Sequence, residues 1–229
     1  MTPRSARPGR PKGTQPPSFD FDESRLTGLV HGDSAMLAAE QLDGIAYADV
    51  ALDEWRLDVG TTIDGCRFTR LELGSWMLRG ARVVESVFDA ADVPVVSAAR
   101  TALRDVEIRD SRFGSVEAYD GAWRGIRFTR CRLGFVNLRA TDLLDVAFVD
   151  CTIDEIDLLD ATARRVAFDG SRIGALNVGG ATLTDVDLRG AELREVVGMA
   201  GLRGATISAE QLQSMAPALA ELAGLRVED

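Results

Sequence analysis

A period of five residues runs through most of this chain. Stepping by five from Ile63 to Leu193 gives 27 positions that are all apolar, although only 46% of the chain is hydrophobic. An α-helix repeats every ~3.6 residues and a β-strand every two, so neither element explains the spacing. Positions two residues earlier carry small residues alternating with Val, Ile or Leu. Two inward side chains in every five, with three facing water, describe one flat side of a coil.

The pattern also repeats every 20 residues. Four sides of five residues make a square coil, in which each side chain stacks on its equivalent one coil away. One column is expected to form a structural stack in the interior: Phe68, Phe88, Ile108, Phe128, Phe148 and Phe168. Four glycines share the same spacing, and we expect them to supply backbone freedom at one side or corner. They are Gly74, Gly114, Gly134 and Gly174.

Three consecutive blocks in residues 181–195 read Ala-Thr-Leu-Thr-Asp, Val-Asp-Leu-Arg-Gly and Ala-Glu-Leu-Arg-Glu. They resemble the A-[DN]-L-x-x repeats of the pentapeptide-repeat family, and the resemblance covers residues 35–207. It implies an all-β fold, a right-handed quadrilateral β-helix. Leu71, Trp76 and Ile126 stand where the family usually has small residues, so we expect slightly wider coils there.

The chain divides into four segments. Residues 1–18 form a basic, Pro-rich tail that we expect to be disordered, because it has too few apolar residues to offset the entropy of ordering. Residues 19–60 form an N-terminal cap and irregular first coils, residues 61–207 the regular β-helix, and residues 208–229 a helical C-terminal cap. An extra residue near positions 58–62 predicts a bulge between two coils. Residues 34–43 are either a short helix capped by Ser34 or an irregular coil.

The C-terminal segment changes to a helical pattern after Ile207. Ser208 and Gln211 fit a capping box, and Pro217 can open a second short helix that ends at Gly224. The last coil of a solenoid exposes apolar side chains and unpaired backbone, so we expect these short helices to cap it. In gyrase-binding members of the resembled family the C-terminal element carries dimerisation. Both a monomer and a homodimer through an end cap therefore stay open.

Catalytic equipment is scarce in this sequence. The single histidine, His31, leaves no His-based zinc site and no Ser-His-Asp triad, and there is no phosphate-binding or dinucleotide-binding motif. Cys131 and Cys151 share an inward column and are interpreted as buried fillers, with a disulfide or metal pair as the alternative, while Cys66 lies on another side. We expect no enzyme, no catalytic residue, no cofactor and no metal.

Charge is unevenly distributed along the chain. The formal net charge is -10, but four of the 26 basic residues lie before residue 18, which leaves 22 basic against 36 acidic residues and a net charge of -14 beyond them. This acidity argues against direct nucleic-acid binding. No apolar run reaches the ~18–20 residues of a membrane span, and no signal peptide is seen. The expectation is a cytoplasmic protein that binds neither nucleic acid nor membrane.

Acidic side chains fall into columns along the predicted rod. The candidate interaction face consists of Glu85, Asp105, Asp145 and Asp185, with Asp110 and Asp150 in the next column. One reading of this face is a solubilising surface. The resemblance implies another, because certain quinolone-resistance members of the family present an acidic rod that mimics DNA and binds gyrase. The prediction is a non-enzymatic protein-interaction scaffold of unknown partner, and the alternative is an acidic DNA mimic that binds DNA gyrase or topoisomerase.

Overall fold

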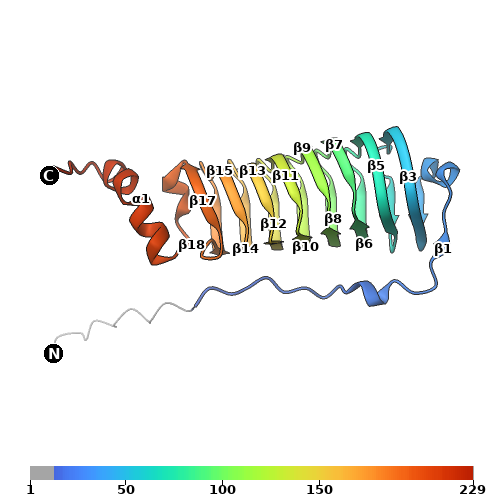
Figure 1. Ribbon diagram of the computed structural model, residues 1–229, viewed down its shortest axis with the longest axis horizontal. Helices are drawn as coiled ribbons and strands as arrows, with labels where there is room; N and C mark the ends of the chain where they lie inside the picture. Colours follow the sequence, from blue (N-terminus) through green and yellow to red (C-terminus); the bar gives the residue numbers. More distant parts are fainter. Residues whose placement is uncertain (1–12, 229) are drawn as a thin grey trace, which may run out of the picture.

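The computed structural model describes residues 13–228, which form a parallel β-solenoid of about eight coils (Figure 1). Strands of eight and six residues alternate from β6 to β15, two more six-residue strands follow, and each pairs with its equivalent one coil away. The eight-residue strands are β6 (Arg82–Asp89), β8 (Ala102–Arg109), β10 (Ala122–Thr129), β12 (Asp142–Val149) and β14 (Thr162–Asp169). The six-residue strands are β7 (Asp92–Ser97), β9 (Arg112–Glu117), β11 (Arg132–Asn137), β13 (Thr152–Asp157), β15 (Arg172–Asn177), β16 (Thr182–Asp187) and β17 (Glu192–Val197).

The first and last coils are less regular. The N-terminal strands are β1 (Val30–His31), β2 (Gln41–Asp43), β3 (Ile45–Arg56), β4 (Thr62–Asp64) and β5 (Arg67–Met77), and β18 (Ala205–Thr206) closes the last coil. Strands β2 and β3 pair with residues 21 positions later, whereas the pairings from β4 to β17 are at 20 and β16 pairs with β18 at 19. The extra residue therefore lies in the loop between β3 and β4, where Val59 is 81% exposed. The bulge expected near residues 58–62 is confirmed.

The apolar positions of the five-residue period fill the interior. Of the 27 positions, Leu103 and Leu193 are half-buried and all the others are buried. The rings of Phe68 and Phe88 have centroids 4.9 Å apart and planes within 3°. This separation is close to the ~4.8 Å distance between neighbouring strands, so each coil places its ring directly on the next.

One member of the interior column is not aromatic. Ile108 follows Phe88 and precedes Phe128 in the strand register, and it interrupts the ring stack. An apolar cavity of about 60 Å³ lies beside it, lined in part by Ala98 and Leu103. Ile108 leaves part of this space because its side chain is shorter than the rings of Phe88 and Phe128 on the neighbouring coils, and the small Ala98 leaves more.

The repeated glycines have a different role from the one expected. Gly134 lies in the extended strand β11, and a Cβ added there would lie 2.2 Å from the carbonyl oxygen of Gly114 on the neighbouring coil. The glycine column therefore permits close backbone approach and does not supply unusual dihedral angles. Left-handed backbone occurs instead at other corners and is often occupied by aspartate, as at Asp105 (φ 57°) and Asp145 (φ 58°). Aspartate tolerates this conformation better than most residues.

The N-terminal segment differs from the predicted disordered tail. Residues 13–22 run extended beside the rod from its C-terminal end toward its N-terminal end (Figure 1), and a short 3₁₀ helix, η1 (Glu23–Arg25), follows. Hydrogen bonds to the rod fix residues 13–18, which the sequence assigned to the tail. Residues 1–12 of that tail lie outside the described part of the chain.

The segment 34–43 contains both of the expected structures. A 3₁₀ helix, η2 (Ser34–Ala38), comes first and β2 follows it. The N-cap is Asp33, whose carboxylate accepts hydrogen bonds from the amides of Ala35 and Met36. The prediction that Ser34 caps this helix is wrong, because the chain becomes helical at Ser34 itself.

One helix covers the C-terminal end, where two were expected. After the 3₁₀ helix η3 (Met199–Leu202), α1 spans Ala209–Leu222, with the predicted capping box of Ser208 and Gln211 and with Pro217 inside it. Proline removes one helical hydrogen bond, but good helix formers on both sides continue the helix through it. The Gln211 amide donates to the carbonyls of Leu188 and Ala191, at 2.6 and 2.7 Å, and so fastens the cap to the last coils. No helix among residues 13–228 is long and apolar enough to cross a membrane.

Candidate interaction face

One side of the rod is covered by the chain's own N-terminal segment. We call residues 13–25 the strap. The strap face is the outward column that runs through strands β5 to β14 together with the charged residues beside it. Its members are Arg67, Val87, Glu107, Arg127, Ala147, Ala167, Asp89, Arg109, Asp145 and Asp185.

Two aspartates of the strap face hold the strap by its backbone. The amide of Gln15 donates to Asp185 over 3.1 Å, and the amide of Ser18 donates to Asp145 over 2.9 Å. Burial opposes the charge on Asp145, but hydrogen bonds from Arg165 and from the Ser18 amide outweigh it and hold the pKa of Asp145 below its ordinary value. Because these contacts use backbone N–H groups, they bind an extended chain of almost any sequence.

Side chains of the strap add more selective contacts. The ring of Phe19 lies 4.2 Å from the guanidinium carbon of Arg127, which is a cation–π contact. Arg127 is oriented by an ion pair with Glu107 at 3.0 Å. Phe21, two residues further along, is only 5% exposed. The two aromatic rings therefore anchor the middle of the strap to the rod.

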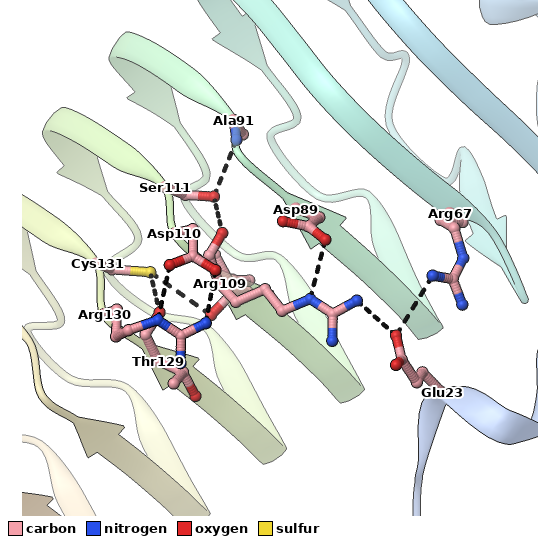
Figure 2. Close-up of polar contacts among 11 residues, drawn as sticks. Glu23, Arg67, Asp89, Ala91, Arg109, Asp110, Ser111, Thr129, Arg130 and Cys131 are labelled. Carbon is pink, nitrogen blue, oxygen red and sulfur yellow. Dashed lines mark hydrogen bonds and ion pairs between the residues drawn. The ribbon is translucent and has the colours of Figure 1, made fainter.

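An ionic cluster anchors the end of the strap (Figure 2). Arg109 lies 2.5 Å from Glu23 and 3.1 Å from Asp89, and Arg67 approaches the same Glu23 carboxylate at 3.3 Å. The hydrogen bond from Arg109 holds the pKa of Glu23 below its ordinary value. Arg67 and Arg109 are 42 residues apart in the sequence, yet both contact the carboxylate of Glu23. The contact joins η1 to both β5 and β8.

Small apolar side chains form the floor of the strap face. Val87, Ala147 and Ala167 occupy outward positions in register with Arg67 and Arg127, yet they are 0%, 6% and 6% exposed. They form a low apolar strip in line with Arg67 and Arg127, which contact the strap. Apolar residues at these outward positions, together with the alternation of Phe19 and Phe21, are the sequence signals that could have revealed the strap.

The predicted acidic face is divided by this arrangement. The structure brings Asp145 and Asp185 together with the strap, whereas the side chain of Glu85 makes no hydrogen bond or ion pair within residues 13–228. Burial raises the pKa of Asp105, which lies in the same column. In the next column, the guanidinium of Arg130 binds the Asp110 carboxylate at 2.6 and 2.7 Å (Figure 2), and Asp150 is exposed. Arginines therefore neutralise part of what the sequence presented as an acidic stripe.

The three cysteines lie inside the coils. All are free and buried, and Cys131 and Cys151 lie in adjacent coils. Burial raises the pKa of the Cys66 thiol, which makes its thiolate scarce near neutral pH. Within residues 13–228 there is no group of three or more His, Cys, Asp or Glu side chains that could hold a metal ion. His31 lies exposed in β1.

Comparisons with known proteins give one family match and several similar solved structures. The family model described as "Pentapeptide repeat region" matches residues 127–197. Among solved structures, trypsin-treated QnrB1, a plasmid-mediated fluoroquinolone resistance protein, is 16% identical, with a TM-score of 0.37 over 80% of this chain and 100% of that chain. HetL, a pentapeptide-repeat protein involved in heterocyst differentiation regulation from the cyanobacterium Nostoc, is also 16% identical, with a TM-score of 0.22 over 69% of this chain and 84% of that chain.

A search of curated proteins gave no significant match. The family match covers part of the solenoid, and the same 20-residue register of parallel strands extends from β4 to β17. The coils outside the matched range are built like those within it. Residues 127–197 are thus similar to the pentapeptide-repeat region of that family.

Proposed function

We propose that this protein is a non-enzymatic cytoplasmic scaffold that binds other proteins through the outer faces of its rod. The strap carries the proposal, because here a rod face already holds an extended polypeptide. The three buried free cysteines are consistent with a reducing compartment.

The solenoid suits this role because its shape and its surface are determined separately. Inward side chains fix the coils, so outward side chains can differ from coil to coil without changing the backbone. On the face formed by β7, β9, β11 and β15, for example, Asp92, Arg112, Arg132 and Arg172 are all exposed. Each face of such a rod is a rigid row of charges at the ~4.8 Å spacing of the strands. Because this row is rigid, the rod loses little conformational entropy when a partner binds to it.

A capture experiment tests the scaffold. The immobilised full-length protein is incubated with an extract of the source cells and compared with full-length variants that reverse two exposed charges on a single face. One such variant is Arg112→Glu with Arg132→Glu. We expect one variant to lose a specific captured protein while it keeps its β-sheet circular dichroism. Identical capture by every variant, or by an unrelated acidic protein, would refute the scaffold.

A second candidate is binding to a type II topoisomerase such as gyrase in place of DNA. The net charge of -14 beyond residue 17 favours it, as does the exposed carboxylate of Asp150. The pairing of Asp110 with Arg130, and the strap over Asp145 and Asp185, weaken it. A duplex-like surface on this rod has fewer free negative charges than the sequence suggests.

Gyrase supercoiling, measured with and without the purified protein at increasing salt, tests this candidate. Charge mimicry of DNA predicts inhibition or protection at low salt that fades as salt screens the charges. A lack of any effect at micromolar protein and low salt would exclude it and would leave the scaffold proposal intact.

A further inference from the structure

We propose that the strap is a releasable internal ligand and that the strap face binds extended segments of partner proteins with the same pattern. That pattern is two aromatic residues two positions apart, followed by an acidic residue two positions later. In this chain the pattern is Phe19, Phe21 and Glu23. The inference rests on the proposed scaffold function and specifies one of its surfaces and the chemistry of its partner.

The repeat distance of the rod fits an extended chain. Asp145 and Asp185 are 40 residues apart, which is two coils, or about 9.6 Å at the usual strand spacing. The amides that they bind belong to Gln15 and Ser18, three residues apart, which an extended chain separates by about 10 Å. Three strap residues therefore span two coils, so successive backbone amides meet successive carboxylates.

Alternate strap residues face the rod. Phe19 and Glu23 are half-buried and Phe21 is buried, whereas Asp20 and Asp22 between them are exposed. The inward set meets Arg127 through the Phe19 ring and meets Arg67 and Arg109 through Glu23. An aliphatic residue in place of Phe19 loses the cation–π contact, and a basic residue in place of Glu23 is repelled by two guanidinium groups. The strap face therefore selects for an aromatic residue at the position of Phe19 and an acidic residue at the position of Glu23, in addition to binding the backbone.

The contacts allow release without unfolding of the coils. Strap residues 13–22 join no β-sheet, and Phe21 is the only residue among 13–25 that is buried. The coils have their own continuous core, to which Phe21 does not belong. Segments with few buried contacts open at far lower free energy than the core that they cover. Once the strap leaves, the apolar floor of Val87, Ala147 and Ala167 becomes available to another segment.

A peptide-binding experiment tests the proposal. A fluorescent peptide with the sequence of residues 13–25 is titrated into the full-length wild type and into the full-length variant Phe19→Ala with Phe21→Ala. We expect the variant to bind the peptide at least tenfold more tightly, because its weakened strap competes less for the face. Adding Arg109→Gln to that variant should reduce binding at least tenfold, whereas adding Arg172→Gln, on another face, should not change it.

Equal binding to the wild type and the strap variant would overturn the proposal, as would binding that survives Arg109→Gln. If the strap variant loses its β-sheet signal, hydrogen exchange of the wild type decides. Strap amides that exchange much faster than coil amides support release, and strap amides that exchange only with the coils contradict it. Failure of this proposal leaves the capture experiment above unaffected, because the variants of that experiment lie on other faces.

Discussion

Replacing Ile108 with phenylalanine should stabilise the protein. Ile108 lies in the interior column between Phe88 and Phe128, beside an apolar cavity of about 60 Å³. Filled parts of the same column stack their rings at 4.9 to 5.0 Å. A ring at position 108 would make two such contacts and would occupy part of the cavity.

The size of the effect follows from the cavity. At about 24 cal/mol per Å³, a void of 60 Å³ costs about 1.4 kcal/mol. Phenylalanine fills only part of this volume, but each new ring pair contributes about 0.5–1.5 kcal/mol. Allowing for some strain on repacking, we expect a net gain of about 1 kcal/mol in the free energy of unfolding. For a chain of 229 residues this raises Tm by about 2–4 °C.

Thermal and urea unfolding followed by circular dichroism provide the measurement. Two further variants serve as controls for this measurement. Ile108→Ala enlarges the cavity and should cost about 2–5 kcal/mol, and Phe148→Ile introduces the same interruption into a filled part of the stack and should also destabilise. A fall in Tm for Ile108→Phe, with the other two variants behaving as expected, would show that the cavity cannot accept a ring and would refute the packing argument.

Three further predictions concern other parts of the structure. Gly134→Ala should lower the urea midpoint by the equivalent of about 1–3 kcal/mol, because its Cβ would lie 2.2 Å from a carbonyl oxygen; an unchanged midpoint would contradict the close approach. Gln211→Ala should cost about 1–3 kcal/mol in thermal unfolding, because it leaves the Ala191 carbonyl without its side-chain donor, removes one of two donors from the Leu188 carbonyl and breaks the capping box. The exposed Gln213→Ala should be neutral, and equal effects would argue against the fastening role. Acidification should loosen the strap. Arg109 lowers the pKa of Glu23, so the stabilisation is present above its ordinary value of 4.5 and is lost as the pH falls through the lower folded value. Strap amide NMR signals should report this change in the wild type, and Glu23→Gln should abolish it near Glu23 while the part that depends on Asp145 persists at Ser18.

The coils were predictable because one physical constraint repeats many times. Each of the 27 apolar positions must point inward, so a position whose residue is ambiguous can be assigned from its neighbours in the same column. The capping box of Ser208 and Gln211 was predictable for a different reason, since both partners lie within one helical turn. The single helix through Pro217 was not, because local proline chemistry favours a break that the surrounding helix formers override.

The strap could not be placed from the sequence by the same reasoning. Its contacts join residues far apart in the chain, such as Gln15 with Asp185 and Glu23 with Arg109, and no period links the two partners. Composition counted Pro16 and Pro17 as signs of disorder. The same prolines favour an extended chain, which is the conformation that the strap adopts on the rod. The spacing of the sequence predicts the acidic columns. It does not predict which arginines pair with them, because the ion pairs depend on side-chain conformation.

The position of the strap on the rod is the central claim, and a distance measurement tests it most directly. Because the three native cysteines are buried, spin labels can be attached selectively to cysteines introduced at the exposed Pro16 and Thr184. In the full-length variant Pro16→Cys with Thr184→Cys, we predict a single short and narrow distance distribution, because Gln15 is held at Asp185. Adding Glu23→Arg should broaden the distribution and lengthen the mean distance. A broad, long distribution before that change would contradict the account.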